Sequence, residues 1–127
     1  MEATPLWHML VTDWTAVENT PPAARRPLVM QRWHFRVERL AELVERPAAE
    51  LAGELKQAAR WEARRRRLTM EAELAEDLAV CRAQGRAVSL PWRRRLEVLA
   101  DICCEPLDEV EARVGRAAST IQVVEVR

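Results

Sequence analysis

Apolar residues recur along most of the chain at spacings of three and four residues, which is typical of amphipathic helices. The first series is Leu6, Leu10, Trp14 and Val17. It follows Thr4 and Pro5, a capping residue and a proline in the order that begins a helix. The pattern predicts a helix that ends before the prolines at positions 21 and 22.

A second helix is predicted from Pro27 to about Arg46. Its apolar stripe consists of Val29, Trp33, Val37, Leu40 and Val44, and another face carries Arg32, Arg36 and Arg39. Pro47 begins the next helix, with a thinner apolar face of Leu51, Leu55, Ala58 and Ala59. Thr69 is a candidate start for a further helix with Met70, Leu74, Leu78 and Cys81 on one side, ending at Gly85. The pattern leaves open whether residues 47–84 form two helices or one.

Ser89 and Pro91 predict the start of another helix, with Trp92, Leu96, Leu99 and Cys103 in register. Pro106 then begins a short helix that carries Leu107, Val110 and Val114. Residues 119–127 remain ambiguous between helix and strand, because isoleucine and valine favour strands while the context is helical. The fold expected is all-α, a compact bundle of about five to six helices.

We expect one domain over residues 1–127. Within it, residues 1–46 form a helical hairpin suited to an interface, residues 47–84 a basic helix pair, and residues 89–127 a helix-turn-helix-like part. The 127 residues include only three glycines and are 49% hydrophobic, which favours a folded helical protein. Five tryptophans are many for so short a chain, and the surplus apolar surface predicts a protein partner or a homo-oligomer.

Charge is balanced overall but unevenly distributed. Residues 19–67 carry twelve bases against six acids, whereas residues 68–127 carry eight bases against eleven acids. No stretch approaches the roughly 20 apolar residues of a membrane span, so no membrane association is expected. Three cysteines without regular spacing favour a reducing compartment, and we expect a cytoplasmic protein without a secretory signal.

The sequence contains few of the residue patterns that are typical of catalytic sites. Two histidines, His8 and His34, stand outside any metal-binding spacing, and no glycine-rich phosphate loop or nucleophile elbow occurs. Cys81 and Cys103 are interpreted as small core residues, and adjacent Cys103 and Cys104 cannot easily share one zinc ion. We therefore expect no enzyme activity, no metal and no cofactor.

Arginine beside tryptophan is the first candidate binding feature. Four consecutive arginines, Arg64, Arg65, Arg66 and Arg67, cover more than one helical turn and cannot all face a core. Trp61 lies off the apolar stripe, so its indole is free to stack on a base, and Arg93, Arg94 and Arg95 form a second basic run. The competing interpretation is a solvated face, with Trp33 and Trp92 as core residues.

The C-terminal part resembles a helix-turn-helix. With Gly115 as the turn glycine, Val110 and Val114 fall on the buried face of the first helix, and Ile121 and Val124 on that of the second. Ser119, Thr120 and Gln122 then lie near the start of the recognition helix, where polar side chains meet phosphates or base edges. The pattern departs from the motif at Glu111 and Arg116, where a small and an apolar residue are usual.

These features predict a non-enzymatic helical protein that binds DNA or RNA, or a small subunit of a nucleoprotein complex. The arginines would contact the nucleic-acid backbone. The alternative is a protein–protein adaptor, chaperone or structural subunit without nucleic-acid contact, in which the basic and acidic parts pair with each other or with a partner.

Overall fold

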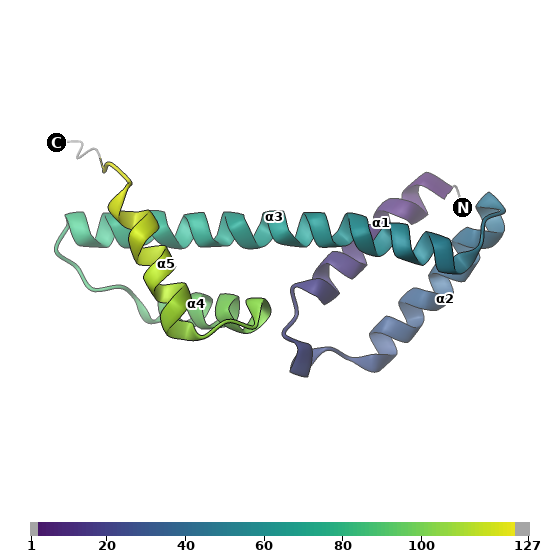
Figure 1. Ribbon diagram of the computed structural model, residues 1–127, viewed down its shortest axis with the longest axis horizontal. Coiled ribbons are helices and arrows are strands. Elements are labelled where there is room, and N and C mark those ends of the chain that lie inside the picture. Colours follow the sequence, from purple (N-terminus) through teal and green to yellow (C-terminus); the bar gives the residue numbers. More distant parts are fainter. Residues whose placement is uncertain (1–2, 124–127) are drawn as a thin grey trace. The chain divides into compact units, whose positions relative to one another are not determined.

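The fold is all-α, as the sequence predicts. The computed structural model describes residues 3–123 of the chain. In these residues it contains five α-helices and one short 3-10 helix (Figure 1). The helices are α1 (Ala3–Glu18), η1 (Pro22–Ala24), α2 (Pro27–Val44), α3 (Ala48–Ala83), α4 (Leu90–Cys103) and α5 (Leu107–Ser119).

Helix α3 shows that residues 47–84 contain one long helix and not two. It is one uninterrupted helix of 36 residues, and Thr69 lies inside it instead of capping a new one. Between Gly53 and Gly85 the sequence has no glycine or proline and is rich in alanine, leucine, glutamate and arginine. These are the strongest helix formers, so nothing in the segment interrupts the helix.

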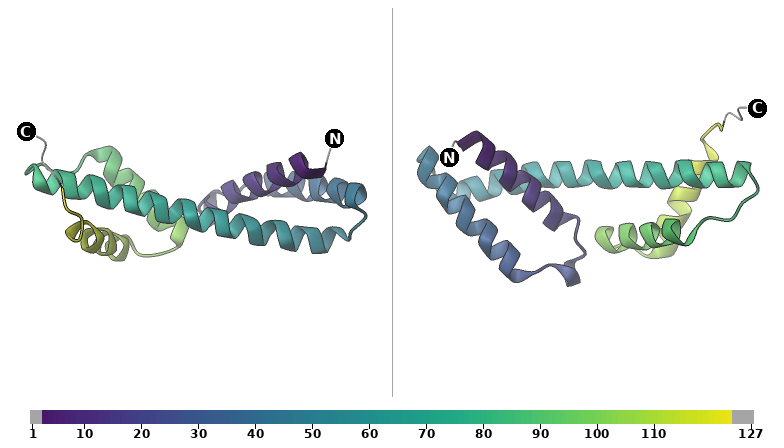
Figure 2. Two further views of the ribbon diagram at one scale, coloured as in Figure 1. Left: turned by 90° about the horizontal axis from the view of Figure 1, so that it is seen from above. Right: turned by 180° about the vertical axis from the view of Figure 1, so that it is seen from behind.

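The contacts divide the chain into two compact units, Met1–Arg65 and Arg66–Arg127, and each unit has its own hydrophobic core. The first unit contains α1, η1, α2 and the N-terminal part of α3. Its core residues come from all three α-helices, namely Leu6, Leu10, Trp14, Val17, Trp33, Val37, Leu40, Ala41, Leu51, Leu55 and Ala59. Helices α1 and α2 are neighbours in this unit (Figure 2).

Trp33 joins α2 to α1. Its side chain is 3% exposed, its ring centroid lies 4.5 Å from that of Trp14, and its indole Nε1 donates a hydrogen bond of 2.8 Å to the Leu10 carbonyl. Lys56 of α3 places its Nζ 4.6 Å from the Trp14 ring centroid, a cation–π contact. The buried indole thus has a polar partner, and the predicted role of Trp33 as a core residue is confirmed.

The predicted stripe of α2 is buried at its three central members, partly buried at Val44 and exposed at Val29. Trp33, Val37 and Leu40 are each at most 3% exposed, whereas Val29 is 45% exposed. Val29 belongs to the first turn of α2 and lines a cavity beside the 3-10 helix, so no core residue covers it. The helix also ends at Val44, before Arg46, because Glu45 adopts a left-handed conformation with φ of 54°.

The second unit contains the C-terminal part of α3 with α4 and α5. Its core consists of Leu74, Ala75, Ala79, Trp92, Leu96, Leu99, Ala100, Val110, Val114 and Ala118. Trp92 is 6% exposed, and its Nε1 donates a hydrogen bond of 3.0 Å to the Leu74 carbonyl. Ser89 caps α4 as predicted, since its Oγ accepts a hydrogen bond from the Trp92 backbone N–H.

The prediction of a turn at Gly115 is wrong. Gly115 lies inside α5, which continues to Ser119, and residues 121–123 have no regular secondary structure. The turn between α4 and α5 lies earlier, where Cys104 adopts φ of 53° and the Glu105 N–H bonds to the Ala100 carbonyl. Val110 and Val114 are fully buried as expected, but the predicted recognition helix does not begin at Ser119. Val124 lies outside the described residues.

We predict that Trp33→Phe lowers the free energy of unfolding by roughly 1–3 kcal/mol, because it removes a buried hydrogen bond and leaves a small cavity. Trp61→Phe is the matched control, since Trp61 is 62% exposed and its replacement should cost less than about 0.5 kcal/mol. Urea unfolding followed by circular dichroism measures both. Equal losses in the two variants would contradict the role assigned to Trp33.

Candidate functional site

The four-arginine turn lies in α3 and faces solvent. Arg64, Arg65 and Arg66 are exposed, Arg67 is half-buried, and Trp61 is 62% exposed one turn earlier. Arg65 makes an exposed ion pair of 3.6 Å with Glu62 three residues before it. Trp61 and the arginines near it therefore form an aromatic and cationic surface on one helix.

In the second basic run, two arginines are exposed to solvent and the third forms ion pairs within the protein. Arg93 and Arg94 are exposed on α4. Arg95 instead pairs with two acids of α3, at 3.0 Å from Glu73 and 3.7 Å from Asp77. These pairs help to hold α4 against α3, so Arg95 is partly neutralised within the chain.

The predicted base-reading residues end α5 instead of beginning a helix. Ser119 Oγ donates to the Gly115 carbonyl and Thr120 Oγ1 donates to the Ala117 carbonyl, at 3.0 and 2.8 Å. Gln122 is exposed in the segment that follows. Two of the three predicted side chains are thus engaged with their own helix, an arrangement that α-helix C-termini commonly show.

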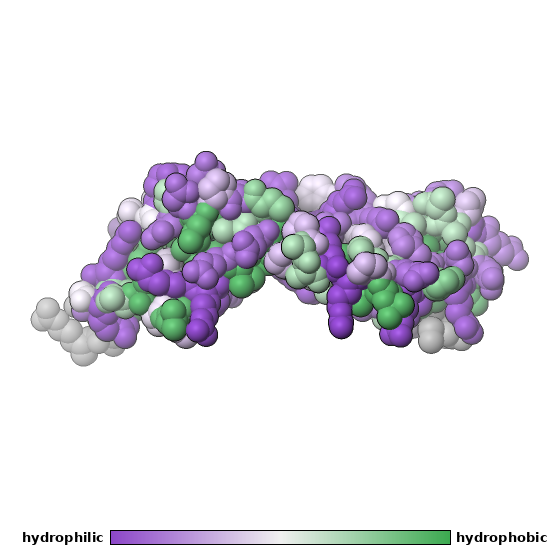
Figure 3. Space-filling view, turned by 90° about the horizontal axis from the view of Figure 1, so that it is seen from below, coloured by the Kyte–Doolittle hydropathy of each residue, from purple (hydrophilic) through white to green (hydrophobic). Residues whose placement is uncertain are grey.

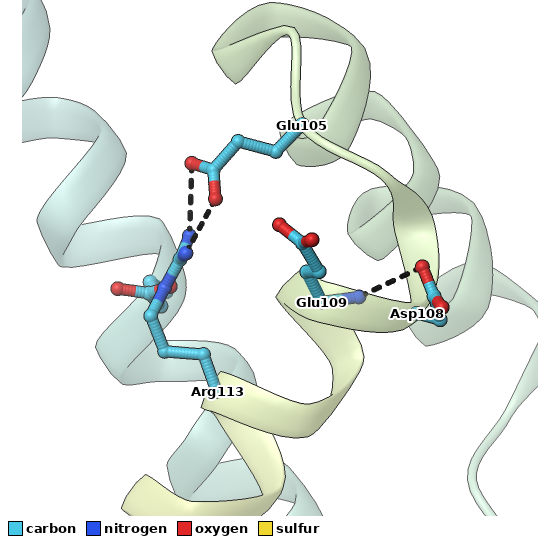
Figure 4. Close-up of polar contacts among 5 residues, drawn as sticks. Glu105, Asp108, Glu109 and Arg113 are labelled. Carbon is cyan, nitrogen blue, oxygen red and sulfur yellow. Dashed lines mark hydrogen bonds and ion pairs between the residues drawn. The ribbon is translucent and has the colours of Figure 1, made fainter.

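Sequence reasoning missed an ion network in the second unit. Arg113 of α5 bonds to Glu105, with Nη1 2.6 Å from the carboxylate (Figure 4). It also pairs with Glu71 of α3. These contacts raise the pKa of Arg113 and lower the pKa of Glu105. Glu71 and Arg113 are 42 positions apart, so no local spacing in the sequence could have indicated the network.

Neither His34 nor Cys103 is activated for chemistry. Desolvation, followed by the nearby charge of Lys56, lowers the pKa of His34, which packs edge-on against Trp33. Burial raises the pKa of the Cys103 thiol, so it is protonated at neutral pH. Within residues 3–123 no group of three or more histidine, cysteine or acidic side chains is placed to hold a metal ion.

A second missed feature is the α2 outer face, which we define as Leu28, Phe35, Glu38, Arg39, Glu42 and Leu43. Phe35 is 61% exposed, Leu28 57% and Leu43 48%. In the described part of the chain, no ion pair involves Glu38, Arg39 or Glu42. Five of these residues, all except Leu28, line a shallow surface depression.

The α2 outer face brings several exposed apolar residues together on one side of a helix. Figure 3 shows one side of the molecule, on which hydrophobic patches alternate with hydrophilic residues. Single exposed apolar residues of this kind are normal. Phe35 lies seven residues after Leu28, so the two occupy similar positions two turns apart on the face opposite Trp33 and Val37. Trp61 and Leu68 repeat this spacing on α3, where both are also exposed.

Comparison with protein-family models, curated proteins and solved structures found no match to this chain. Among the described helices, none combines the length and apolar character needed to cross a membrane.

We predict that Arg113→Met lowers the melting temperature at pH 7 by a few degrees, because two acids lose their partner. Since the folded-state pKa of Glu105 lies below its ordinary value of 4.5, the stability from this pair is present above that pH. It is lost as the pH falls through the lowered pKa. The difference between variant and parent should therefore shrink below about pH 4.5.

Arg116→Met is the control for this experiment. Arg116 is exposed on the same helix and makes no ion pair within residues 3–123. Thermal unfolding by circular dichroism from pH 3 to 7 provides the measurement. A difference between Arg113→Met and Arg116→Met that stayed constant with pH would contradict the electrostatic origin.

Proposed function

We propose that this chain is a non-enzymatic helical protein that acts by binding another protein through the α2 outer face. The carrying observation is Phe35, a large aromatic side chain left 61% exposed on the side of α2 opposite the core. The outward face of a helix packed on a small core is ordinarily polar. An apolar centre at Phe35 needs another explanation, and a partner surface provides one.

The neighbours of Phe35 support this proposal. Protein interfaces combine a buried aromatic or aliphatic centre with a polar rim, and aromatic residues are enriched at their centres. Here Leu28 and Leu43 extend the apolar centre, while Glu38, Arg39 and Glu42 provide charges of both signs. Covering Phe35 would contribute roughly 1.5–3 kcal/mol if its burial became complete. A partner helix with an apolar stripe and complementary charges fits this face.

Other features fit a binding role without catalysis. The neutral His34 and the protonated Cys103 offer no activated acid, base or nucleophile. The three cysteines are free, which supports the cytoplasm as the working compartment. The partner on the α2 outer face is either a different protein or a second copy of this chain, and the experiment below separates them.

We expect a photo-crosslinking phenylalanine analogue at Phe35 to capture a protein partner in intact source cells. The same analogue at Gln57, an exposed position of α3 in the same unit, is the control. Mass spectrometry then identifies the cross-linked peptide as a different protein or as this chain. Capture at Gln57 equal to that at Phe35, or no capture at Phe35, would overturn the proposal.

Nucleic-acid binding is the second candidate, and one observation favours it. Trp61 is 62% exposed, and the exposed Arg64 and Arg65 follow it by three and four residues on α3. Side chains at these spacings lie on the same side of a helix. An indole beside guanidinium groups is suited to stack on an unpaired base while neutralising the adjoining phosphates. A flexible single strand offers both an unpaired base for Trp61 and phosphates for the arginines.

For this candidate we expect single-stranded RNA or DNA to bind more tightly than duplex, with affinity that falls steeply as salt rises. Arg64→Gln with Arg65→Gln should weaken binding, and Trp61→Ala should cost about 1–3 kcal/mol. Arg39→Gln on the α2 outer face is the charge control. Fluorescence anisotropy across a salt series measures these effects, and equal losses in Arg39→Gln would contradict a specific surface on α3.

A further inference from the structure

A cavity of about 410 Å³ lies in the first unit between α1, η1 and α2. The buried side chains of Val17 and Trp33 line it, and Ala16, Ala24, Val29 and Met30 add further apolar surface. Its volume is within the range of roughly 300–1,000 Å³ typical of small-molecule sites, which are mostly apolar with a few polar groups. The cavity is separate from the α2 outer face, with which it shares no residue.

Four arginines, one acid and Thr20 complete the lining of this cavity, and the Thr20 hydroxyl donates to the Ala16 carbonyl of α1. The acid, Asp13, is paired with Arg36 at 3.2 Å. Arg25 is held by the backbone, since its Nε and Nη2 donate to the carbonyls of Thr20 and Glu18 at 3.1 and 3.4 Å. Arg25 therefore fixes the segment that closes one side of the cavity.

Arg26 and Arg32 have no such partners. Both are exposed, both line the cavity, and neither makes an ion pair in the part of the chain that the structure describes. With Asp13 neutralised by Arg36, the cavity has an apolar interior and an uncompensated positive rim. Guanidinium groups bind oxyanions through paired hydrogen bonds, more strongly than neutral donors do.

We propose that this cavity is a binding site for a small organic anion, in which an apolar body lies against Trp33 and an oxyanion head meets Arg26 and Arg32. The ligand class is an aliphatic or aromatic carboxylate or phosphate ester. An apolar body is required because Val17, Trp33 and Met30 offer no hydrogen-bond partner to a polar one; the Trp33 indole N–H is already bonded to Leu10. This site goes beyond the proposed protein-binding role and does not depend on it.

The test uses three ten-carbon probes, decanoate, decyl phosphate and 1-decanol, with the full chain in isothermal titration calorimetry. We expect the two anions to bind with a Kd on the order of 0.1 mM or below, and the alcohol to bind at least tenfold more weakly. The ratio of decanoate to decyl phosphate affinity shows which head group the rim prefers. Alcohol binding equal to that of both anions would overturn the role of the arginines.

Substitutions of the two rim arginines test whether the anions bind in this cavity. Arg26→Gln with Arg32→Gln should weaken anion binding roughly tenfold or more, whereas Arg39→Gln on the other side of α2 should leave it unchanged. All three arginines are exposed, so the folded state should persist, which circular dichroism verifies. No binding of either anion near about 1 mM, or equal losses in Arg39→Gln, would overturn the proposal. Phe35→Glu should leave anion binding intact, which separates this result from the protein-binding test.

Discussion

The hydrogen bond from the Trp33 indole to the Leu10 carbonyl, together with the burial of Trp33, determines which way α2 faces. Burying a tryptophan without a partner for its N–H would be unfavourable, and α1 supplies that partner within a packed apolar core. Once Trp33, Val37 and Leu40 point inward, helical geometry turns Phe35 outward. The same constraint places Trp33 in the lining of the cavity beside Arg26 and Arg32. Both proposed binding surfaces of the first unit therefore follow from one fixed helix orientation.

The second unit also contains a buried tryptophan whose indole N–H donates to a backbone carbonyl of a neighbouring helix. Trp92 of α4 donates to the Leu74 carbonyl of α3, much as Trp33 of α2 donates to α1. Helix α3 contributes mainly leucine and alanine to both cores, with Leu51, Leu55 and Ala59 in one and Leu74, Ala75 and Ala79 in the other. Small side chains on α3 leave room for a tryptophan from a neighbouring helix. In each unit, tryptophan side chains from the shorter helices thus pack against the small residues of α3: Trp14 and Trp33 in the first unit and Trp92 in the second.

The apolar periodicity of the sequence was enough to predict the all-α fold, the exposure of Trp61 and most of the buried residues, although Val29 and Leu107 of the predicted apolar series are exposed. It could not decide whether residues 47–84 form one helix, because Thr69 is compatible with both a cap and an interior position. Gly115 was misread as a turn because glycine usually occupies the left-handed position after a helix, yet Cys104 takes it here despite a cost of about 1–2 kcal/mol. The Arg113 network and the cavity arginines depend on tertiary contacts. The spacing of Leu28 and Phe35 was visible in the sequence, but only the structure shows that nothing in the described part of the chain covers them.

Hydroxyl-radical footprinting of the protein in its native complexes tests the central claim most directly. Phe35 and Trp61 are 61% and 62% exposed in the free chain, so each is an internal reference for the other. Oxidation of each side chain is compared between the pure protein and the protein isolated under native conditions from its source cells. The account predicts that Phe35 becomes protected while Trp61 remains reactive. Protection of Trp61 with Phe35 still reactive, or no protection of either, would contradict it.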